Sequence, residues 1–257
     1  MNNFLASIGR VILNFLAQTG NLSIFCFSVF MGIFRRPFYF RSILNQMMEI
    51  GYYSLPVVGL TAIFTGAVLA LQSYTGFSRF SAESAVATVV VLSITRELGP
   101  VLAGLMVAGR VGASMAAEIG TMRITEQIDA LVTLSTNPIK YLVTPRMIAA
   151  VIMMPCLVLI ADIIGVMGGY FISVYTLGFS QDIYLQNTFQ FLEIADVTSG
   201  LIKSAVFGFI IAIIGCYSGY NSAKGAQGVG SATTNAVVVS SILILLTNYL
   251  LTKVFFS

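Results

Sequence analysis

Two adjacent residues of opposite charge stand inside one of the most apolar parts of the sequence. Arg96 and Glu97 fall in SITRELGPVLAGLMVAGR, residues 93–110, and Gly99-Pro100 follow directly. A charge at mid-membrane costs roughly 2.5–3.5 kcal/mol on insertion scales, and such residues usually face a cavity or each other. Because proline has no N–H, Pro100 deprives the Arg96 carbonyl of its helical partner and predicts a kink. Lipid tolerates such a site where it lines a cavity.

Two interpretations of this pair are open. The side chains could satisfy each other, although neighbours on a helix point about 100° apart and do not face each other directly. Alternatively, they line the head-group end of a lipid cavity, where Arg96 binds a phosphate and Glu97 accepts from an amine or holds a neighbouring helix. Gln72 and Tyr74 are weaker candidates for the same wall. A further intramembrane acid, Asp162, is predicted to make a helix–helix hydrogen bond instead.

The composition indicates a membrane protein. Of the 257 residues, 57% are hydrophobic and 9% are charged, whereas a soluble domain has about 25% charged residues. The absence of histidine excludes histidine-based metal or acid–base chemistry. Three scattered cysteines in apolar runs predict no metal site, and a net charge of +3 gives no indication of nucleic acid.

Long uncharged runs predict five membrane spans, over residues 50–73, 84–109, 147–175, 198–219 and 236–256. Residues 1–34 are predicted to form an amphipathic, interfacial or re-entrant elbow, because the apolar run 22–34 covers only about 20 Å of a roughly 30 Å hydrocarbon core. A true span over 13–34 is the alternative. The expected fold is therefore an all-α polytopic membrane protein, with the elbow preceding a membrane domain over 45–257.

Basic residues predict the orientation. Four precede the first span and four lie between the second and third: Arg10, Arg35, Arg36, Arg41, and Arg110, Arg123, Lys140, Arg146. The positive-inside rule then places the N-terminus in the cytoplasm and the C-terminus outside. Small residues four apart predict close helix packing at Ala62/Gly66/Ala70, Gly165/Gly169 and Gly215/Gly219.

The segment between the second and third spans is predicted to be cytoplasmic, with a short helix over about 117–131. Ile119, Met122, Ile128 and Leu131 fall near one apolar stripe, and acidic and basic residues occupy the rest. The helix either lies on the membrane surface or docks into a protein groove. Mixed charge favours the groove, because surface helices carry mainly Lys and Arg on their polar face.

No nucleotide site is predicted in the chain. A phosphate-binding loop needs the pattern G-x-x-x-x-G-K-[ST], but in KGAQGVGSATT, residues 224–234, the lysine precedes the glycines. This stretch is predicted to be a flexible turn. Any energy input must then come from a partner protein.

The segment RELGPVLAGLMVAGRVGASMAAEIGTMRITEQIDAL resembles the signature of the MlaE family of ABC-transporter permeases. The stretches ALQSYTGFSRFSAE, NPIKYLVTPR, LIKSAVFGF and SATTNAVVVSS extend the resemblance over nearly the whole chain in the same order, with a departure at VTLSTNPIKY. The resemblance implies a multi-pass permease of the bacterial inner membrane that moves phospholipids between the inner and outer membranes.

The same resemblance implies an assembly. The permease would be a homodimer with five spans per chain, a lipid cavity between the copies and two cytoplasmic ATPase subunits that bind ATP and Mg²⁺. A STAS-domain protein and a periplasmic MCE-domain protein are further implied partners. The implied ATPase-coupling residues are Glu118, Ile119, Gly120, Met122, Arg123, Glu126 and Gln127.

Two other functions are compatible with the residues. One is an ion-coupled secondary transporter that uses Arg96, Glu97 and Asp162 as a relay, although no clear internal repeat supports it. The other is a membrane scaffold that anchors partners. Transport that needs ATP and ignores a proton gradient distinguishes the permease from the secondary transporter, and a scaffold tolerates loss of its intramembrane charges.

Overall fold

The protein is a bundle of long helices. The computed structural model describes residues 2–34, 38–80 and 85–256, and every regular element in these ranges is helical. Six described segments are long and apolar enough to cross a membrane: Ile12–Ile33, Phe40–Phe77, Ala85–Ile124, Ile139–Thr176, Ile194–Tyr220 and Ala226–Phe256. The predicted all-α membrane fold is confirmed. Arg35 and Arg36, which were counted for the orientation, lie outside the described residues.

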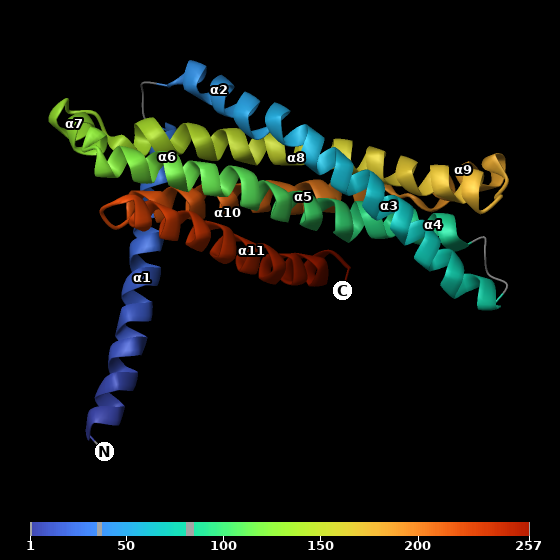
Figure 1. The fold of residues 1–257 in the computed structure, drawn as a ribbon, viewed down its shortest axis with the longest axis horizontal. Helices are drawn as coiled ribbons and strands as arrows, with labels where there is room; N and C mark the ends of the chain where they lie inside the picture. The colour runs from blue at the N-terminus through green and yellow to red at the C-terminus, as the bar shows by residue number, and fades with distance from the viewer. Residues whose placement is uncertain (1, 35–37, 81–84, 257) are drawn as a thin grey trace.

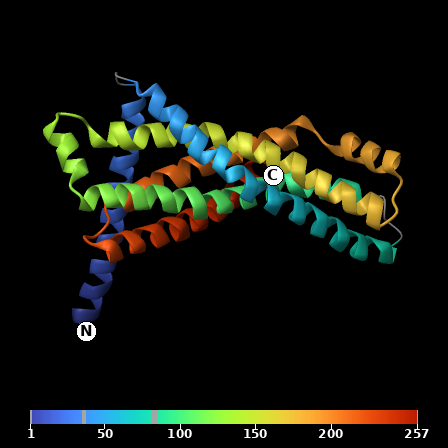
Figure 2. The same ribbon diagram turned by 45° about the horizontal axis from the view of Figure 1, so that its top comes forward.

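The N-terminal helix α1, Asn2–Phe34, runs across the long axis of the bundle in both views (Figures 1 and 2). Only its C-terminal part docks on the bundle, where the Phe25 ring packs 5.4 Å from the Tyr217 ring and 6.0 Å from the Tyr220 ring, centroid to centroid. Leu13 and Leu16 further back are exposed. The crosswise course favours the predicted elbow over a sixth span, although the helix is long enough for either.

The first span begins earlier than predicted. It comprises α2, Phe40–Ile50, a 3₁₀ turn over Tyr52–Ser54 and α3, Leu55–Phe77. The third consists of α8, Thr144–Phe171, with π-helical turns at Ile139–Val143 and Ile172–Thr176. The short helix α9, Gln181–Phe191, connects it to α10, Ile194–Tyr220, and α11, Ala226–Phe256, ends the described chain. Helices exceed the apolar runs because backbone hydrogen bonding continues into polar sequence.

The second span is one continuous rod that carries Arg96 and Glu97. It consists of α4, Ala85–Ser93, the π-helical turn η3, Ile94–Leu98, α5, Gly99–Val107, a second π-helical turn, Ala108–Gly112, and α6, Ala113–Ile124. At 1.5 Å per residue the rod is about 60 Å long, so it passes well beyond the membrane. Both charges lie in the wider turn η3, directly before Pro100, and such turns are frequent at functional sites.

Glycines set the closest helix crossings. Where α3 crosses α8, a Cβ on Gly66 would collide with the Gly165 carbonyl, and a Cβ on Gly219 of α10 would lie 2.6 Å from the Ala116 carbonyl of α6. The small-residue packing predicted from the sequence is therefore present. Larger side chains fill the core between these crossings, including Val58, Met154, Leu157, Phe207 and Ile211.

Candidate functional site

Arg96 does not pair with Glu97 but with the start of α10. Its Nε donates to Oδ1 of Asp196 at 2.7 Å, and its guanidinium carbon lies 4.6 Å from the centroid of the Phe256 ring. The other Asp196 oxygen, Oδ2, accepts the backbone N–H of Glu193 at 3.1 Å and so caps α10. The ion pair is a charge-assisted hydrogen bond, and the ring adds a cation–π contact.

Glu97 joins two further helices. Its Oε1 accepts from Nζ of Lys203 on α10 at 2.8 Å and from the hydroxyl of Thr252 on α11 at 2.8 Å. Its Oε2 accepts from Nδ2 of Asn248, one turn earlier on α11, at 2.7 Å. The carboxylate thus connects η3, α10 and α11, and the interpretation of a mutual Arg96–Glu97 pair is wrong.

Lys203 compensates for Pro100. Its Nζ donates to the Arg96 carbonyl at 2.9 Å, which is the carbonyl that a proline at position 100 leaves without its helical partner. It also donates to the Thr252 hydroxyl at 2.8 Å. With the bond to Glu97, all three N–H groups of the ammonium are used. The side chain is fully buried, so it supplies this donor to the rod from within the bundle.

We name the set of Arg96, Glu97, Asp196, Lys203, Asn248 and Thr252 the intramembrane cluster. It lies at the end of α11, part of the way along the bundle (Figure 1). The Arg96 and Glu97 side chains retain 35% and 36% exposure, whereas their partners Asp196 and Lys203 retain 1% and 0%. Only the first two charges can therefore contact a ligand without unfolding the bundle.

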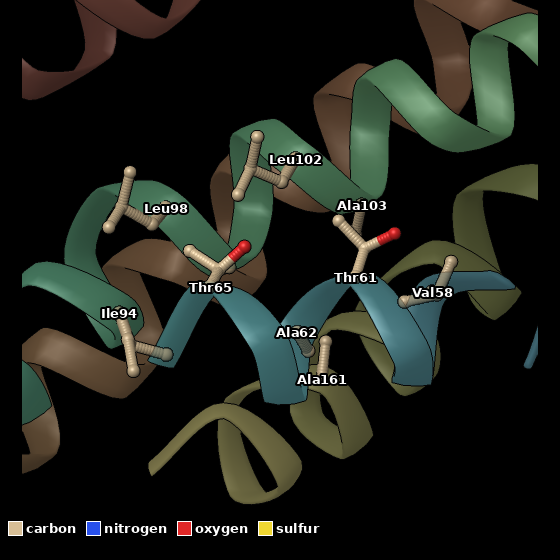
Figure 3. Close-up of a pocket in the computed structure, with 10 residues that line it drawn as sticks. Val58, Thr61, Ala62, Thr65, Ile94, Leu98, Leu102, Ala103 and Ala161 are labelled. Carbon is tan, nitrogen blue, oxygen red and sulfur yellow. The ribbon is translucent and has the colours of Figure 1, made fainter. Parts of the chain in front are cut away.

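A small cavity beside η3 is not a lipid site. It has about 20 Å³ and lies between α3 and α5, with Thr61 and Thr65 opposite Leu98 and Leu102 (Figure 3). That volume suits about one water molecule. A lipid that contacts Arg96 and Glu97 must therefore bind on the exposed side of these two side chains. Lipid binding by Arg96 and Glu97 stays a prediction.

Gln72 and Tyr74 do not join the intramembrane cluster. In the described part of the chain no hydrogen bond links either residue to it. The Tyr74 ring packs 5.7 Å from the Phe179 ring, beside a separate apolar group around Val90, and Gln72 is exposed on α3. The aromatic partner, rather than the charges, fixes Tyr74.

Four cluster residues were not predicted: Asp196, Lys203, Asn248 and Thr252. Asp196 lies just before the predicted span 198–219, and no role was assigned to Lys203 inside it. A signal was present, because Lys203 falls inside the run 198–219 and a lysine there needs an acid at the same depth. Asn248 and Thr252 stand four apart on one helix face, but nothing in their spacing names Glu97 as their partner.

Asp162 makes no helix–helix hydrogen bond, so that prediction is wrong. Its side chain is buried on α8, and neither carboxylate oxygen has a partner within residues 2–34, 38–80 and 85–256. A Cβ on Gly99 of α5 would collide with Oδ1 of Asp162, so the carboxylate faces a residue that has no side chain to bond with it. Asp162 thus lies near η3 but outside the intramembrane cluster.

The segment between the second and third predicted spans forms two helices rather than the single helix predicted over 117–131. The first, α6, ends at Ile124, and α7 covers Gln127–Thr133. Between them Glu126 has φ +59°, a left-handed conformation that turns the chain. The turn allows Ile119 of α6 and Ile128 of α7, which are 0% and 1% exposed, both to pack on the core of the bundle.

Burial divides the predicted coupling residues. Ile119 and Gly120 are buried and cannot contact another protein directly, whereas Glu118, Arg123, Glu126 and Gln127 are exposed and Met122 is half-buried. A groove of about 380 Å³ opens here, lined by Ala117, Glu118, Thr121, Met122 and Gln127.

One ion pair anchors this groove. Glu118 Oε2 accepts from Nη2 of Arg146 at 2.7 Å, which holds α6 to the base of α8. The buried Arg146 also donates through Nη1 to the Leu142 carbonyl at 2.7 Å. One wall of the groove is therefore attached to the third span.

Comparison with known proteins identifies the family. The sequence matches the family model described as "Permease MlaE" over residues 43–254. The chain belongs to the MlaE permease family. It is 66% identical over 254 residues to a "Probable ABC transporter permease protein" of Rickettsia bellii, which covers 99% of this chain and 98% of that protein. A Synechocystis protein with the same description is 43% identical over 228 residues, covering 89% and 87%.

A more distant relative has a more specific name. The "Intermembrane phospholipid transport system permease protein MlaE" of Haemophilus influenzae is 33% identical over 257 residues, covering 99% of this chain and 98% of that protein. The chain is thus an ABC transporter permease, a multi-pass membrane subunit whose family implies an ATPase partner.

Proposed function

We propose that this MlaE-family permease moves phospholipids between the inner and outer membranes of a bacterium. The intramembrane cluster carries the proposal, because it holds two partly exposed opposite charges inside an apolar bundle. Arg96 bonds Asp196 through Nε, so the N–H groups on its two terminal nitrogens are available for a phosphate. The name of the Haemophilus influenzae relative supports a phospholipid as the substrate.

The lipid chamber forms between two copies of the chain. The outer face of α11 is apolar and exposed, with Val238, Ile242, Leu245 and Tyr249 at helical spacing and 50–66% exposed. Asn248 and Thr252 lie at the flank of this exposed face and belong to the cluster, so a second copy packed near α11 would border the exposed sides of Arg96 and Glu97. An MCE-domain protein receives lipid on the periplasmic side.

Energy enters at the α6–α7 end of the bundle. A separate ATPase, which binds ATP and Mg²⁺, docks on the groove between Ala117 and Gln127, and a STAS-domain protein binds that ATPase. The groove supports this docking because it is an open hollow with the exposed Glu118 in its wall, and the exposed Arg123 and Glu126 lie in the same segment. Arg110, Arg123, Lys140 and Arg146 lie in the segment around this end, which favours a cytoplasmic N-terminus and a periplasmic C-terminus in the inner membrane.

Transport by the reconstituted complex tests the proposal. Permease and ATPase are placed in proteoliposomes, and transfer of labelled phospholipid is measured together with the phospholipid that co-purifies. Arg96→Ala and Glu97→Ala are expected to reduce both, whereas Arg79→Ala, an exposed arginine in the turn after α3, leaves both unchanged. Size-exclusion profiles check that each variant remains folded.

The same assay separates the alternatives. Wild-type lipid occupancy and transport in both cluster variants would remove the proposed site. Transport that ignores ATP and follows an imposed proton gradient would indicate the ion-coupled secondary transporter. A complex that assembles but moves no lipid under any energy supply would indicate a scaffold.

A further inference from the structure

One face of α11 continues past the intramembrane cluster to an aromatic ring. Asn248 and Thr252, which both donate to Glu97, are followed four positions later by Phe256. Residues four apart lie one above the other on a helix, so Phe256 extends the face that carries these two polar side chains. Its ring is 41% exposed and, as a hydrocarbon, takes no part in the hydrogen bonds of the cluster.

The Phe256 ring borders both cations of the cluster. The guanidinium carbon of Arg96 lies over the ring, 4.6 Å from its centroid, and Nζ of Lys203 lies 5.9 Å from the same centroid. Both distances are within the roughly 6 Å over which a cation is attracted to the face of an aromatic ring. Lys203 is fully buried and uses all three of its N–H groups within the bundle. Any effect of the ring on a ligand must therefore act through Arg96.

Two contacts hold the guanidinium group of Arg96. Its Nε donates to Asp196 at 2.7 Å, and the Phe256 ring covers one of its sides. Neither Nη1 nor Nη2 donates to an acceptor among the described residues, and neither is among the fully buried polar atoms that lack a partner. Both terminal nitrogens therefore reach the exposed part of the side chain, where they form the fork that binds two oxygens of one phosphate.

We propose that Phe256 is a positioning residue for Arg96, and that its ring strengthens the preference of the site for lipids that carry a phosphate. The inference rests on the phosphate contact proposed above for Arg96. An arginine side chain that is already held loses less conformational freedom when a phosphate binds, so the ring favours the phosphate and not the hydrocarbon chains. A residue that only filled space at the end of α11 would affect every lipid alike.

Competition between two lipids that differ only by a phosphate tests the proposal. The reconstituted permease–ATPase complex in mild detergent is offered dioctanoyl phosphatidic acid and dioctanoylglycerol, and native mass spectrometry measures the ratio in which they bind. The wild type is expected to prefer phosphatidic acid. Phe256→Leu, which removes the aromatic face but no hydrogen-bonding group, is expected to lower this preference about three- to tenfold. Phe256→Tyr, which retains the ring, is expected to bind both lipids like the wild type.

The neighbouring Phe255 provides the matched control. It is 38% exposed on the same helix, and its ring makes no cation–π contact with a described residue, so Phe255→Leu is expected to keep the wild-type preference. An unchanged preference in Phe256→Leu, or an equal loss in Phe255→Leu, would overturn the proposal, as would an equal loss in Phe256→Tyr. Thermal unfolding of each variant checks that the bundle remains intact.

Arg96→Ala separates this inference from the proposed function. A complex of Arg96→Ala that still prefers phosphatidic acid would show that Arg96 does not bind the phosphate, and both proposals would fail. A preference that is lost in Arg96→Ala but kept in Phe256→Leu would reject the role of Phe256 alone.

Discussion

The Lys203–Glu97 and Arg123–Asp129 ion pairs have similar lengths, 2.8 and 3.0 Å, yet belong to different surroundings. The first has side-chain exposures of 0% and 36% and lies inside the bundle, while the second has 42% and 62% and lies at the α6–α7 turn. The contribution of each pair to stability is therefore expected to follow its burial rather than its length, because a buried partner cannot return to water when the pair is broken. The Arg146–Glu118 pair, whose side chains are 7% and 45% exposed, falls between the other two pairs in burial.

The largest effect is expected for Lys203→Met. The change leaves Glu97 without its cation and the Arg96 carbonyl without a donor, so the free energy of unfolding should fall by roughly 3–5 kcal/mol. Thermal unfolding in mild detergent measures the change. Lys253→Met, on an exposed position of α11, is the matched control and should unfold like the wild type. Equal stability of Lys203→Met and Lys253→Met would show that burial does not determine how much an ion pair contributes to stability.

Arg146→Met should have the next largest effect. It removes hydrogen bonds to Glu118 and the Leu142 carbonyl, and a hydrogen bond to a charged group contributes about 1.5–3 kcal/mol. Because Glu118 lines the groove at which the ATPase subunit is proposed to dock, the variant should also bind that subunit more weakly, which a pull-down measures. Full ATPase binding together with lowered stability would show that the Arg146–Glu118 ion pair is not needed for docking.

Asn248→Leu should have a smaller effect within the same cluster. Glu97 loses one donor but keeps Lys203 and Thr252, and hydrogen bonds between membrane helices average about 0.6 kcal/mol, with a maximum near 1.7 kcal/mol. Comparing its unfolding temperature with that of Lys203→Met separates the charge from the neutral bond. A loss as large as that of Lys203→Met would mean that the network fails as one unit.

Arg123→Gln should have the smallest effect on stability. Its partner Asp129 is exposed, and such pairs contribute about 0.2–1 kcal/mol. The small difference in free energy of unfolding between the wild type and Arg123→Gln should decrease further at 1 M salt, where the Debye length is about 3 Å. The effect of Lys203→Met should persist at that salt concentration. Unfolding at low and high salt measures both, and equal salt dependence would contradict the assigned burial.

Much of the fold was predictable because the bilayer constrains it. Apolar runs identified the helices near α3, α8, α10 and α11, and small residues identified crossings such as Gly66 on Gly165. The missing N–H of Pro100 predicted an unsatisfied Arg96 carbonyl. The donor that meets it could not be predicted, because Lys203 is 107 positions away from Arg96 and only the packing of α10 brings it there.

The site was predicted less completely. Arg96 and Glu97 were singled out correctly as an unusual feature, but their bonds to Asp196 and Lys203 required the depth of each helix to be known. At the α6–α7 end, Ile119 and Ile128 suggested one helix with a single apolar stripe. The structure instead directs both residues inward from two helices, because the left-handed turn at Glu126 changes the direction of the chain.

The resemblance to the MlaE family implied a partner that supplies energy. The sequence alone determined that this chain crosses a membrane several times and carries charges inside it. Those properties follow from local composition, since lipid excludes unsatisfied polar groups wherever they occur. Only the tertiary structure decided that Lys203 is the buried centre of a network, that Asp162 has no hydrogen-bond partner among the described residues and that Ile119 is inside. These are properties of distances between helices, which hydropathy along one chain does not encode.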